Sequence, residues 1–236
     1  MKIEKKLDVI ARNYKPEKDF DKYLIRYGAG YIIKNIRRTN VLEIGCASGI
    51  MTDILVRNFK KVAIVEGAQK YAQQMKRKYG SKIKCYISVV ERFETKEKFD
   101  NIIAAHLIEH LHNPIKQLKR MKKWLKPNGF LHIIVPNANS LNRLFGLKLG
   151  IIRNVNELTP RDIKLGHKRV YNKKMLFQHI RRAGLSVAEI KGIYLKPLPN
   201  NRMIRYSKKT IHAFYEIGNM VPSDLCNELY ARCAVS

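Results

Sequence analysis

The segment Val41–Gly49, of sequence VLEIGCASG, constrains the fold more than any other part of the chain. An apolar, β-capable run passes directly into a loop with glycines at positions 45 and 49, and a helical pattern of apolar residues follows. A buried strand that turns through glycines into a helix presents bare backbone N–H groups to a ligand. The pattern E-x-G-x-x-x-G is not the dinucleotide pattern, so we predict a loop that packs against a nucleoside and an amino-acid tail.

A second strand, predicted over Val62–Val65, ends in Glu66-Gly67, about 20 residues beyond the glycine loop. In folds of this kind, an acidic side chain at the tip of the second strand hydrogen-bonds a ribose hydroxyl. We therefore predict that Glu66 accepts the hydroxyl protons of a ribose. The alternative is a solvated glutamate at a strand end.

Two further segments complete a recurring order of motifs. After the glycine loop and the second strand come Phe99–Leu111, of sequence FDNIIAAHLIEHL, and Trp124–Pro136, of sequence WLKPNGFLHIIVP. Taken together, the four segments resemble class I S-adenosylmethionine-dependent methyltransferases. The subgroup they resemble most contains ubiquinone-biosynthesis O-methyltransferases and many sugar and natural-product methyltransferases. The resemblance covers roughly residues 38–137 and continues weakly to about 190.

The resemblance implies a Rossmann-like, doubly wound α/β fold. Its sheet should have seven mostly parallel strands, an N-terminal helical lid and a cap inserted after strand five. It also implies S-adenosylmethionine as cofactor, released as S-adenosylhomocysteine. The cofactor-binding residues that we expect are Glu43, Gly45, Cys46, Ala47, Gly49, Glu66, Gly67, Val90, Glu91, His106 and Leu107. For Cys46, simple packing of the loop is the competing interpretation.

The end of the third strand departs from the family pattern. Many relatives place an aspartate there, near the adenine amino group, whereas this chain reads Ile87-Ser-Val-Val-Glu91. Backbone groups of Val89 and Val90 can still bond the adenine edge, and Glu91 follows a residue or two late. We expect Val90 to contact the adenine.

Alternating strand and helix patterns predict the order of elements. Strands are expected at 40–45, 61–65, 83–87, 100–104 and 130–135, and helices at 50–58, 68–79, 114–125 and 173–183. A final strand pair is expected near 186–195, and two amphipathic helices between Ile211 and Tyr230. We divide the chain into a lid at 1–38, a cofactor-binding core at 39–137, a cap at 138–172 and the C-terminal part of the same domain, with its helical tail, at 173–236.

A hydroxyl acceptor benefits from a general base, and histidine is the natural choice near neutral pH. His167, in the stretch Gly166–Tyr171, is the expected catalytic base, because related methyltransferases carry a similar GH-x-R-x-Y/F stretch at this point. The alternative is a brace between cap and sheet. The expected substrate-binding residues are Tyr14, Arg26, His110, Asn137, Arg169 and Tyr171. For Tyr14 and Arg26 an ordinary amphipathic helix is the competing interpretation.

A metal site is also conceivable from spacing alone. His106, Glu109 and His110 stand at i, i+3 and i+4, so one helical face could present all three to a cation. The set has no obvious fourth ligand, and the resembled family mostly works without metal. We therefore expect no metal. A structural hydrogen bond at a helix start is the competing role for His110.

Charge leaves the choice of partner open. The net charge is +28, and residues 139–210 hold 17 Lys and Arg against three Asp and Glu. Such a surplus favours an anionic acceptor or RNA, although genome composition and solvated helix faces also produce it. Three functions remain: an O-methyltransferase of a small molecule or bacterial glycan, an RNA methyltransferase, and a non-catalytic partner subunit. A homodimer is also compatible with the tail.

The expected location is the cytoplasm. The four cysteines show no C-x-x-C spacing or pairing pattern, which suits a reducing compartment. The start of the chain, MKIEKKLDVI, lacks the apolar core of a signal peptide, and no apolar run is long enough to span a membrane.

Overall fold

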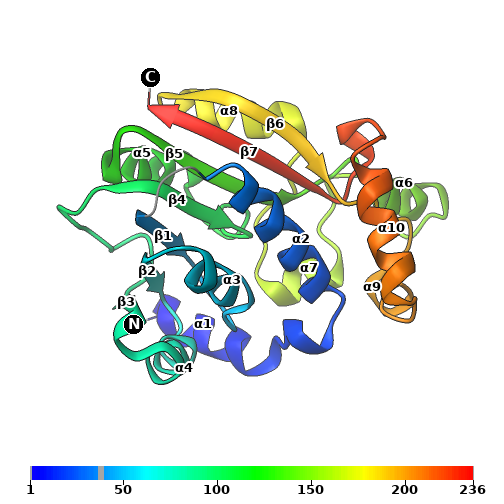
Figure 1. Ribbon diagram of the computed structural model, residues 1–236. Coiled ribbons are helices and arrows are strands. Elements are labelled where there is room, and N and C mark those ends of the chain that lie inside the picture. The colour runs from blue at the N-terminus through cyan, green and yellow to red at the C-terminus, as the bar shows by residue number, and fades with distance from the viewer. Residues whose placement is uncertain (1, 37–39, 236) are drawn as a thin grey trace.

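Seven strands form one sheet in the order β3-β2-β1-β4-β5-β7-β6, with helices on both faces (Figure 1). The computed structural model describes residues 2–36 and 40–235. The first five strands run parallel, and β7 runs antiparallel to β5 and β6. The strands are β1 (Asn40–Ile44), β2 (Lys61–Glu66), β3 (Ile83–Ile87), β4 (Phe99–Ala105), β5 (Leu125–Pro136), β6 (Leu185–Ile193) and β7 (Glu228–Val235). The expected doubly wound, mostly parallel sheet is confirmed.

Three helical segments precede the sheet, and the others connect its strands. Those before β1 are α1 (Lys2–Asn13), η1 (Pro16–Lys18) and α2 (Asp21–Lys34). Those between β1 and β5 are α3 (Ile50–Asn58), α4 (Gln69–Tyr79), η2 (Gly80–Lys82) and α5 (Pro114–Trp124). The remainder are α6 (Leu141–Lys148), α7 (Pro160–Leu165), α8 (Lys173–Arg182), α9 (Asn200–Met203), α10 (Lys208–Gly218) and η3 (Ser223–Leu225).

Local chemistry explains several of the helix starts. The side chain of Asn113 accepts the backbone N–H of Lys116, and Pro114 occupies the first turn of α5. Such a cap satisfies an N–H that has no partner within the helix. Proline supplies a helical φ and has no backbone N–H that would be left unpaired in the first turn. Thr159 and Asp162 form a reciprocal capping box at the start of α7.

Each face of the sheet has its own apolar core. Along β2, for example, Ala63 and Val65 belong to one core, and Val62 and Ile64 to the other. Helices α5 and α8 cover the first face with Leu118, Trp124 and Leu176, and α2, α3 and α10 contribute to the second with residues such as Leu24, Leu55 and Ile211. The strands are thus buried on both sides, as parallel strands with helical crossovers require.

The C-terminal tail differs from the prediction. Only β6 lies in the region expected to hold the final strand pair, and its partner β7 comes from the end of the chain. The predicted second amphipathic helix, which was to include Leu229 and Tyr230, is this strand. Because β7 lies between β5 and β6, residues 228–231 are all buried, and a short apolar run buried on both faces does not reveal its period.

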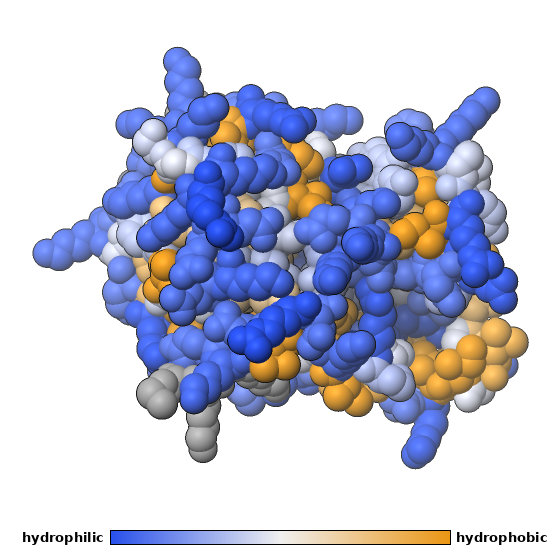
Figure 2. Space-filling model, turned by 90° about the horizontal axis from the view of Figure 1, so that it is seen from below, coloured by the Kyte–Doolittle hydropathy of each residue, from blue (hydrophilic) through white to orange (hydrophobic). Residues whose placement is uncertain are grey.

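The surface is mainly hydrophilic, with small apolar groups scattered over the face in Figure 2 and a larger one at its lower right. Exposed apolar side chains include Phe145, Leu149 and Ile151, on and after α6. The division of the chain into lid, core, cap and tail stays a prediction, and its first boundary, between residues 38 and 39, lies outside the described residues. Within the described ranges no helix is long and apolar enough to cross a membrane. The four cysteines are free thiols.

Candidate active site

A cavity of about 880 Å³ lies at the carboxyl ends of the parallel strands. Its walls come from the loops after β1, β2, β3 and β4, from α1 and α2, from the segment 136–168 and from residues 196–200. A volume of this size suits a cofactor together with a small acceptor, since ligand pockets commonly measure about 300–1,000 Å³. In open parallel sheets this edge is where ligands bind.

The loop after β1 turns with left-handed backbone at three positions. Gly45, Ala47 and Gly49 have φ of 80°, 45° and 87°. At Gly49 a Cβ atom would lie 2.6 Å from Sδ of Met75, so packing and backbone conformation both require glycine. Gly45 and Ala47 line the cavity, whereas Gly49 starts α3 behind it. Of the eleven expected cofactor residues, Gly49 is the one outside the lining.

Glu66 fastens this loop to the end of β2. Its carboxylate accepts the backbone N–H groups of Ala47 at 3.0 Å and Ala68 at 2.7 Å, one on each oxygen. The side chain is buried, and burial raises its pKa although these hydrogen bonds oppose the shift. The thiol of Cys46 donates a further hydrogen bond, at 3.5 Å, to the oxygen that Ala47 contacts. Because a carboxylate oxygen can accept two hydrogen bonds, the oxygen bonded by Ala68 is the one better placed to accept a ligand hydroxyl.

Glu43 lies beneath the same loop. It is buried, and Thr52 donates a hydrogen bond to its carboxyl oxygen at 2.6 Å. Burial raises the pKa of Glu43 to about 8, against the opposing effect of Thr52. The carboxyl group is therefore mostly protonated at neutral pH and can donate a hydrogen bond as well as accept one.

The loop after β3 supplies an apolar wall. Val89 and Val90 are buried, and Ser88, Val89, Val90 and Glu91 all line the cavity. Leu7 and Ile10 of α1 and Leu24 of α2 contribute further apolar groups to the lining. These groups can pack against a flat ring, and the contact of Val90 with the adenine stays a prediction.

His106 follows β4 with an unusual backbone φ of 51°. Its Nε2 lies 3.1 Å from Oε1 of Glu228, and its Nδ1 lies 3.8 Å from Glu109. Burial, the largest influence, lowers the pKa of His106, but the two carboxylates outweigh it and raise the pKa to about 9. His106 is thus an imidazolium at neutral pH and cannot act as a base there.

His167 and His110 meet on the cap side of the cavity. Nδ1 of His167 lies 3.1 Å from Oδ1 of Asp162, and its ring contacts the edge of His110, with centroids 4.7 Å apart. Both histidines line the cavity. Burial lowers the pKa of His110, which is therefore neutral at pH 7. With Asp162 beside Nδ1, the basic nitrogen of a neutral His167 is Nε2.

A cation could fit among three of these side chains. Ligand atoms of Glu109, His110 and His167 all lie within 4.8 Å of one another. Neither carboxylate oxygen of Glu109 has a hydrogen-bond partner among the described residues. This set shares Glu109 and His110 with the one considered from the sequence but replaces His106, which faces Glu228 instead.

The expected substrate residues divide into two groups. Tyr14, His110 and Asn137 line the cavity. Arg26 is exposed on α2 and lies outside the lining. Arg169 also lies outside it, because its guanidinium donates to backbone carbonyls of Ile108, Leu111 and His112.

Tyr171 is a second brace rather than a cavity residue. It is fully buried, its hydroxyl lies 3.1 Å from Nδ1 of His179, and its backbone pairs with Asn137. Arg169 and Tyr171 therefore hold the cap against the sheet, the alternative that the sequence left open for this stretch.

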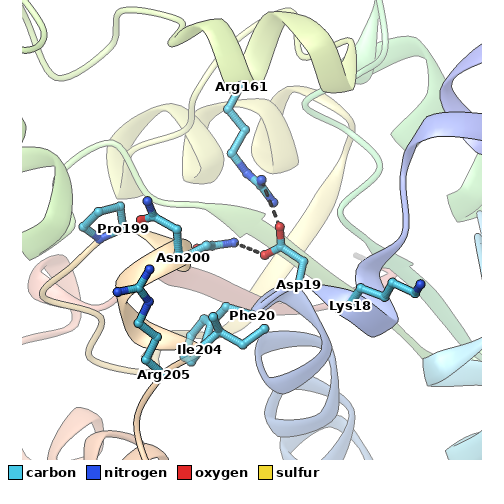
Figure 3. Close-up of a pocket in the computed structure, with 9 residues that line it drawn as sticks. Lys18, Asp19, Phe20, Arg161, Pro199, Asn200, Ile204 and Arg205 are labelled. Atoms are coloured by element: carbon cyan, nitrogen blue, oxygen red, sulfur yellow. Dashed lines mark hydrogen bonds and ion pairs between the residues drawn. The ribbon is translucent and has the colours of Figure 1, made fainter.

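Many cavity residues were not expected, among them the polar or charged Asp21, Arg161, Lys196, Asn200 and Glu228. Figure 3 shows a second pocket that shares Arg161 and Asn200 with the cavity, and there both side chains point at Asp19. Arg161 and Asn200 also bond Asp21, at 2.7 Å each. The unexpected residues named above come from four distant segments, and the sequence held no signal that would join them.

A family model described as a methyltransferase domain matches residues 12–190. The ubiquinone biosynthesis O-methyltransferase of Rickettsia canadensis is 22% identical over 166 residues, which are 67% of this chain and 67% of that protein. The (S)-coclaurine N-methyltransferase of Papaver somniferum is 30% identical over 100 residues, 40% of this chain and 28% of that one.

The fold also matches solved structures. The N-methyltransferase NodS from Bradyrhizobium japonicum, crystallised with S-adenosylhomocysteine, superposes with a TM-score of 0.58. The match covers 91% of this chain and 86% of that one at 17% identity. At an identity this low, the superposition establishes the shared fold alone. The family assignment rests on the family model.

Proposed function

This chain belongs to the methyltransferase-domain family and is an S-adenosylmethionine-dependent methyltransferase, and we propose that it methylates a hydroxyl group of a small-molecule or glycan acceptor, with His167 as general base. When bound, S-adenosylmethionine supplies a methyl group on a positively charged sulfur, which an acceptor nucleophile can attack. The protein's part is to hold both reactants in line and to exclude water.

The residues present fit this cofactor. Glu66 presents its buried carboxylate at the end of β2, where a ribose would lie. Val89 and Val90 supply an apolar wall for the adenine. The left-handed loop at residues 45–49 leaves room for close approach of the ligand to the backbone.

The pairing of His167 with Asp162 supports a basic role. Burial raises the pKa of Asp162, but His167 and Thr159 lower it by more. The pKa of Asp162 therefore lies well below its usual range. The resulting carboxylate stabilises the imidazolium that forms when Nε2 takes the acceptor proton. The alternative histidines are less suited: His106 is already protonated at neutral pH, and the carboxylate beside His110, Glu109, is near His106 and His167 as well.

The apolar side chains of the cap favour an acceptor with an apolar part. Phe145, Leu149, Ile151 and Ile152 line the cavity, and the first three of them are exposed. A fully hydrated sugar would leave this apolar surface uncovered. We therefore favour a hydroxylated small molecule with an apolar portion over a glycan chain.

The single observation that carries the proposal is the position of the Asp162–His167 pair in the same cavity as Glu66 and the glycine loop. The test is transfer of a labelled methyl group from S-adenosylmethionine to a panel of hydroxylated aromatic compounds, lipids and sugars. We expect methyl ethers that His167→Ala forms far more slowly than the wild type. Equal turnover by the variant would remove His167 from the chemistry.

An amine acceptor is the second candidate, favoured by the 30% identity to a plant N-methyltransferase over 100 residues. The carbon shift of the transferred methyl group separates an ether from an N-methyl product. Adding RNA to the same assay tests the remaining alternative, since incorporation into RNA would indicate a nucleic-acid substrate.

A further inference from the structure

Lys196 is a buried charged residue that the proposed chemistry does not use. It lies between β6 and α9, and only 7% of it is exposed. It nevertheless lines the cavity, near Pro197, Leu198 and Asn200. Lysine is almost never buried without a strong reason, because its ammonium group loses its hydration there.

The ammonium group has few partners. Within residues 2–36 and 40–235 its one hydrogen bond goes to Oδ1 of Asn200, at 2.8 Å. An ammonium has three N–H donors, so two remain for other acceptors. Asn200 is uncharged, and this bond therefore does little to offset the cost of burying a positive charge.

The neighbouring aspartates are engaged by other side chains. Asp19 and Asp21 accept hydrogen bonds from Arg161 and from Nδ2 of Asn200, as Figure 3 shows for Asp19. Oε1 of Glu228 lies 3.1 Å from His106, and Oε2 of Glu228 has no hydrogen-bond partner among the described residues. Within the described ranges no carboxylate is therefore in hydrogen-bond contact with Lys196.

Burial lowers the pKa of Lys196 to about 8, although Asp21 and Glu228 oppose the shift. The amine is therefore still mostly protonated at pH 7. A negatively charged ligand placed beside it would restore the electrostatic stabilisation that burial removed.

We infer that Lys196 binds a negatively charged group of the acceptor, a carboxylate or a phosphate, inside the cavity. The inference rests on the proposed function, because it assigns the substrate class of the same site. A compact anion fits the remaining two donors of the ammonium, and a charge-assisted hydrogen bond in a buried site is strong. The acceptor would then combine a hydroxyl, an apolar part and an acidic group.

Binding of small anions tests this directly. Malonate and inorganic pyrophosphate are titrated calorimetrically into protein saturated with S-adenosylhomocysteine. The variants are Lys196→Met and Lys196→Gln, which remove the charge, and Lys196→Arg, which keeps it. Arg202→Met is the matched control, because Arg202 is an exposed cation on α9 outside the cavity lining.

We expect the wild type to bind at least one anion, and both neutral variants to bind it about tenfold or more weakly. Lys196→Arg should retain most of the affinity, and Arg202→Met all of it. An equal loss in Arg202→Met would show a general surface effect and overturn the inference. Absence of anion binding to the wild type would also overturn it. Two neutral variants are used in case one does not fold.

The pH dependence gives an independent readout. The charged groups facing Lys196 are Asp19 and Asp21 from the N-terminal segment, Arg161 from α7 and Glu228 from β7. Anion affinity of the wild type should fall as pH rises through about 8, and that of Lys196→Gln should not. A parallel fall in both would assign the titration to another group and contradict the inference.

Affinity for S-adenosylhomocysteine separates the remaining outcomes. If the neutral variants lose cofactor affinity about tenfold, Lys196 holds the cofactor's own carboxylate and the inference is wrong. If the wild type fails to bind S-adenosylhomocysteine, the proposed function itself fails. Normal cofactor binding without anion binding overturns only the role of Lys196.

Discussion

Nε2 of His106 lies 3.1 Å from Oε1 of Glu228, so the end of β4 is tied to the start of β7 across the intervening strand β5. Glu109 approaches the other ring nitrogen at 3.8 Å. The imidazolium of His106 lies between these two carboxylates and links the end of β4 to β7. The protonation state of His106 should therefore influence the free energy of unfolding.

The pH dependence of stability follows from this pair. Because the pKa of His106 is raised from 6.5 to about 9, the folded state binds the proton more tightly. The contribution is fully present below pH 6.5 and is lost as pH rises through 9; it is at most roughly 3 kcal/mol. We expect the free energy of unfolding in urea to fall between pH 6 and 9.5 more steeply for the wild type than for His106→Gln.

Lys196 works in the opposite direction, since its lowered pKa makes folding more favourable as pH rises from about 8 to 10.5. Comparing two proteins that both contain Lys196 cancels this contribution. Identical pH slopes for the wild type and His106→Gln would show that His106 is not held protonated by Glu228.

Glu66→Ala should weaken binding of S-adenosylhomocysteine. The substitution removes the carboxylate that we assign to the ribose and also the two N–H contacts that fix the loop. The expected cost is about 1–3 kcal/mol for a lost charged hydrogen bond, measured by calorimetric titration. Glu97→Ala, at an exposed ion pair with Lys84, is the control. Unchanged affinity would exclude Glu66 from the cofactor site.

His167→Ala should lower kcat by about 10²–10⁴-fold while leaving affinity for S-adenosylhomocysteine within a few-fold. Asp162→Asn should lower kcat less, because the imidazole remains but loses its supporting charge. His212→Ala, at an exposed histidine on α10, is the matched control. A large loss of cofactor affinity with normal kcat would return His167 to the role of a brace.

Gly49→Ala should destabilise the fold through two effects. The left-handed φ of 87° is strained for alanine, and the added Cβ would collide with Met75. Gly150 also has a positive φ, of 69°, but a Cβ there would meet nothing within 4 Å. Gly150→Ala therefore reports the backbone cost alone, about 1 kcal/mol, and we expect Gly49→Ala to exceed it clearly in chemical denaturation. Equal losses would mean that Met75 moves aside freely.

The residues that the sequence assigned to the cofactor gather in one cavity because local patterns specify their positions. Strand, glycine loop and helix are adjacent in the chain, and Glu66 ends the next strand. All of the expected cofactor residues except Gly49 line the cavity. Glycine is required at position 49 because a Cβ there would collide with Met75. This contact lies behind the cavity surface, and the sequence alone does not reveal it.

The acceptor side was predicted less completely. His167, His110, Tyr14 and Asn137 reach the cavity, whereas Arg169 and Tyr171 brace the cap and Arg26 faces solvent. Residue types suggested contacts with a ligand, but an arginine fits backbone carbonyls as well as it fits a carboxylate. Only the folded geometry distinguishes the two.

By itself, the sequence determined where the parallel strands lie along the chain, the glycine turn and the acidic strand end, because hydrophobic period and glycine placement act over a few neighbouring residues. The tertiary structure alone decided that the C-terminal segment becomes β7 between β5 and β6. It also brought Glu228 to His106, Asp162 to His167, and Lys196 to the cavity wall. These contacts join distant segments, and their electrostatic effects depend on burial, which local sequence does not specify.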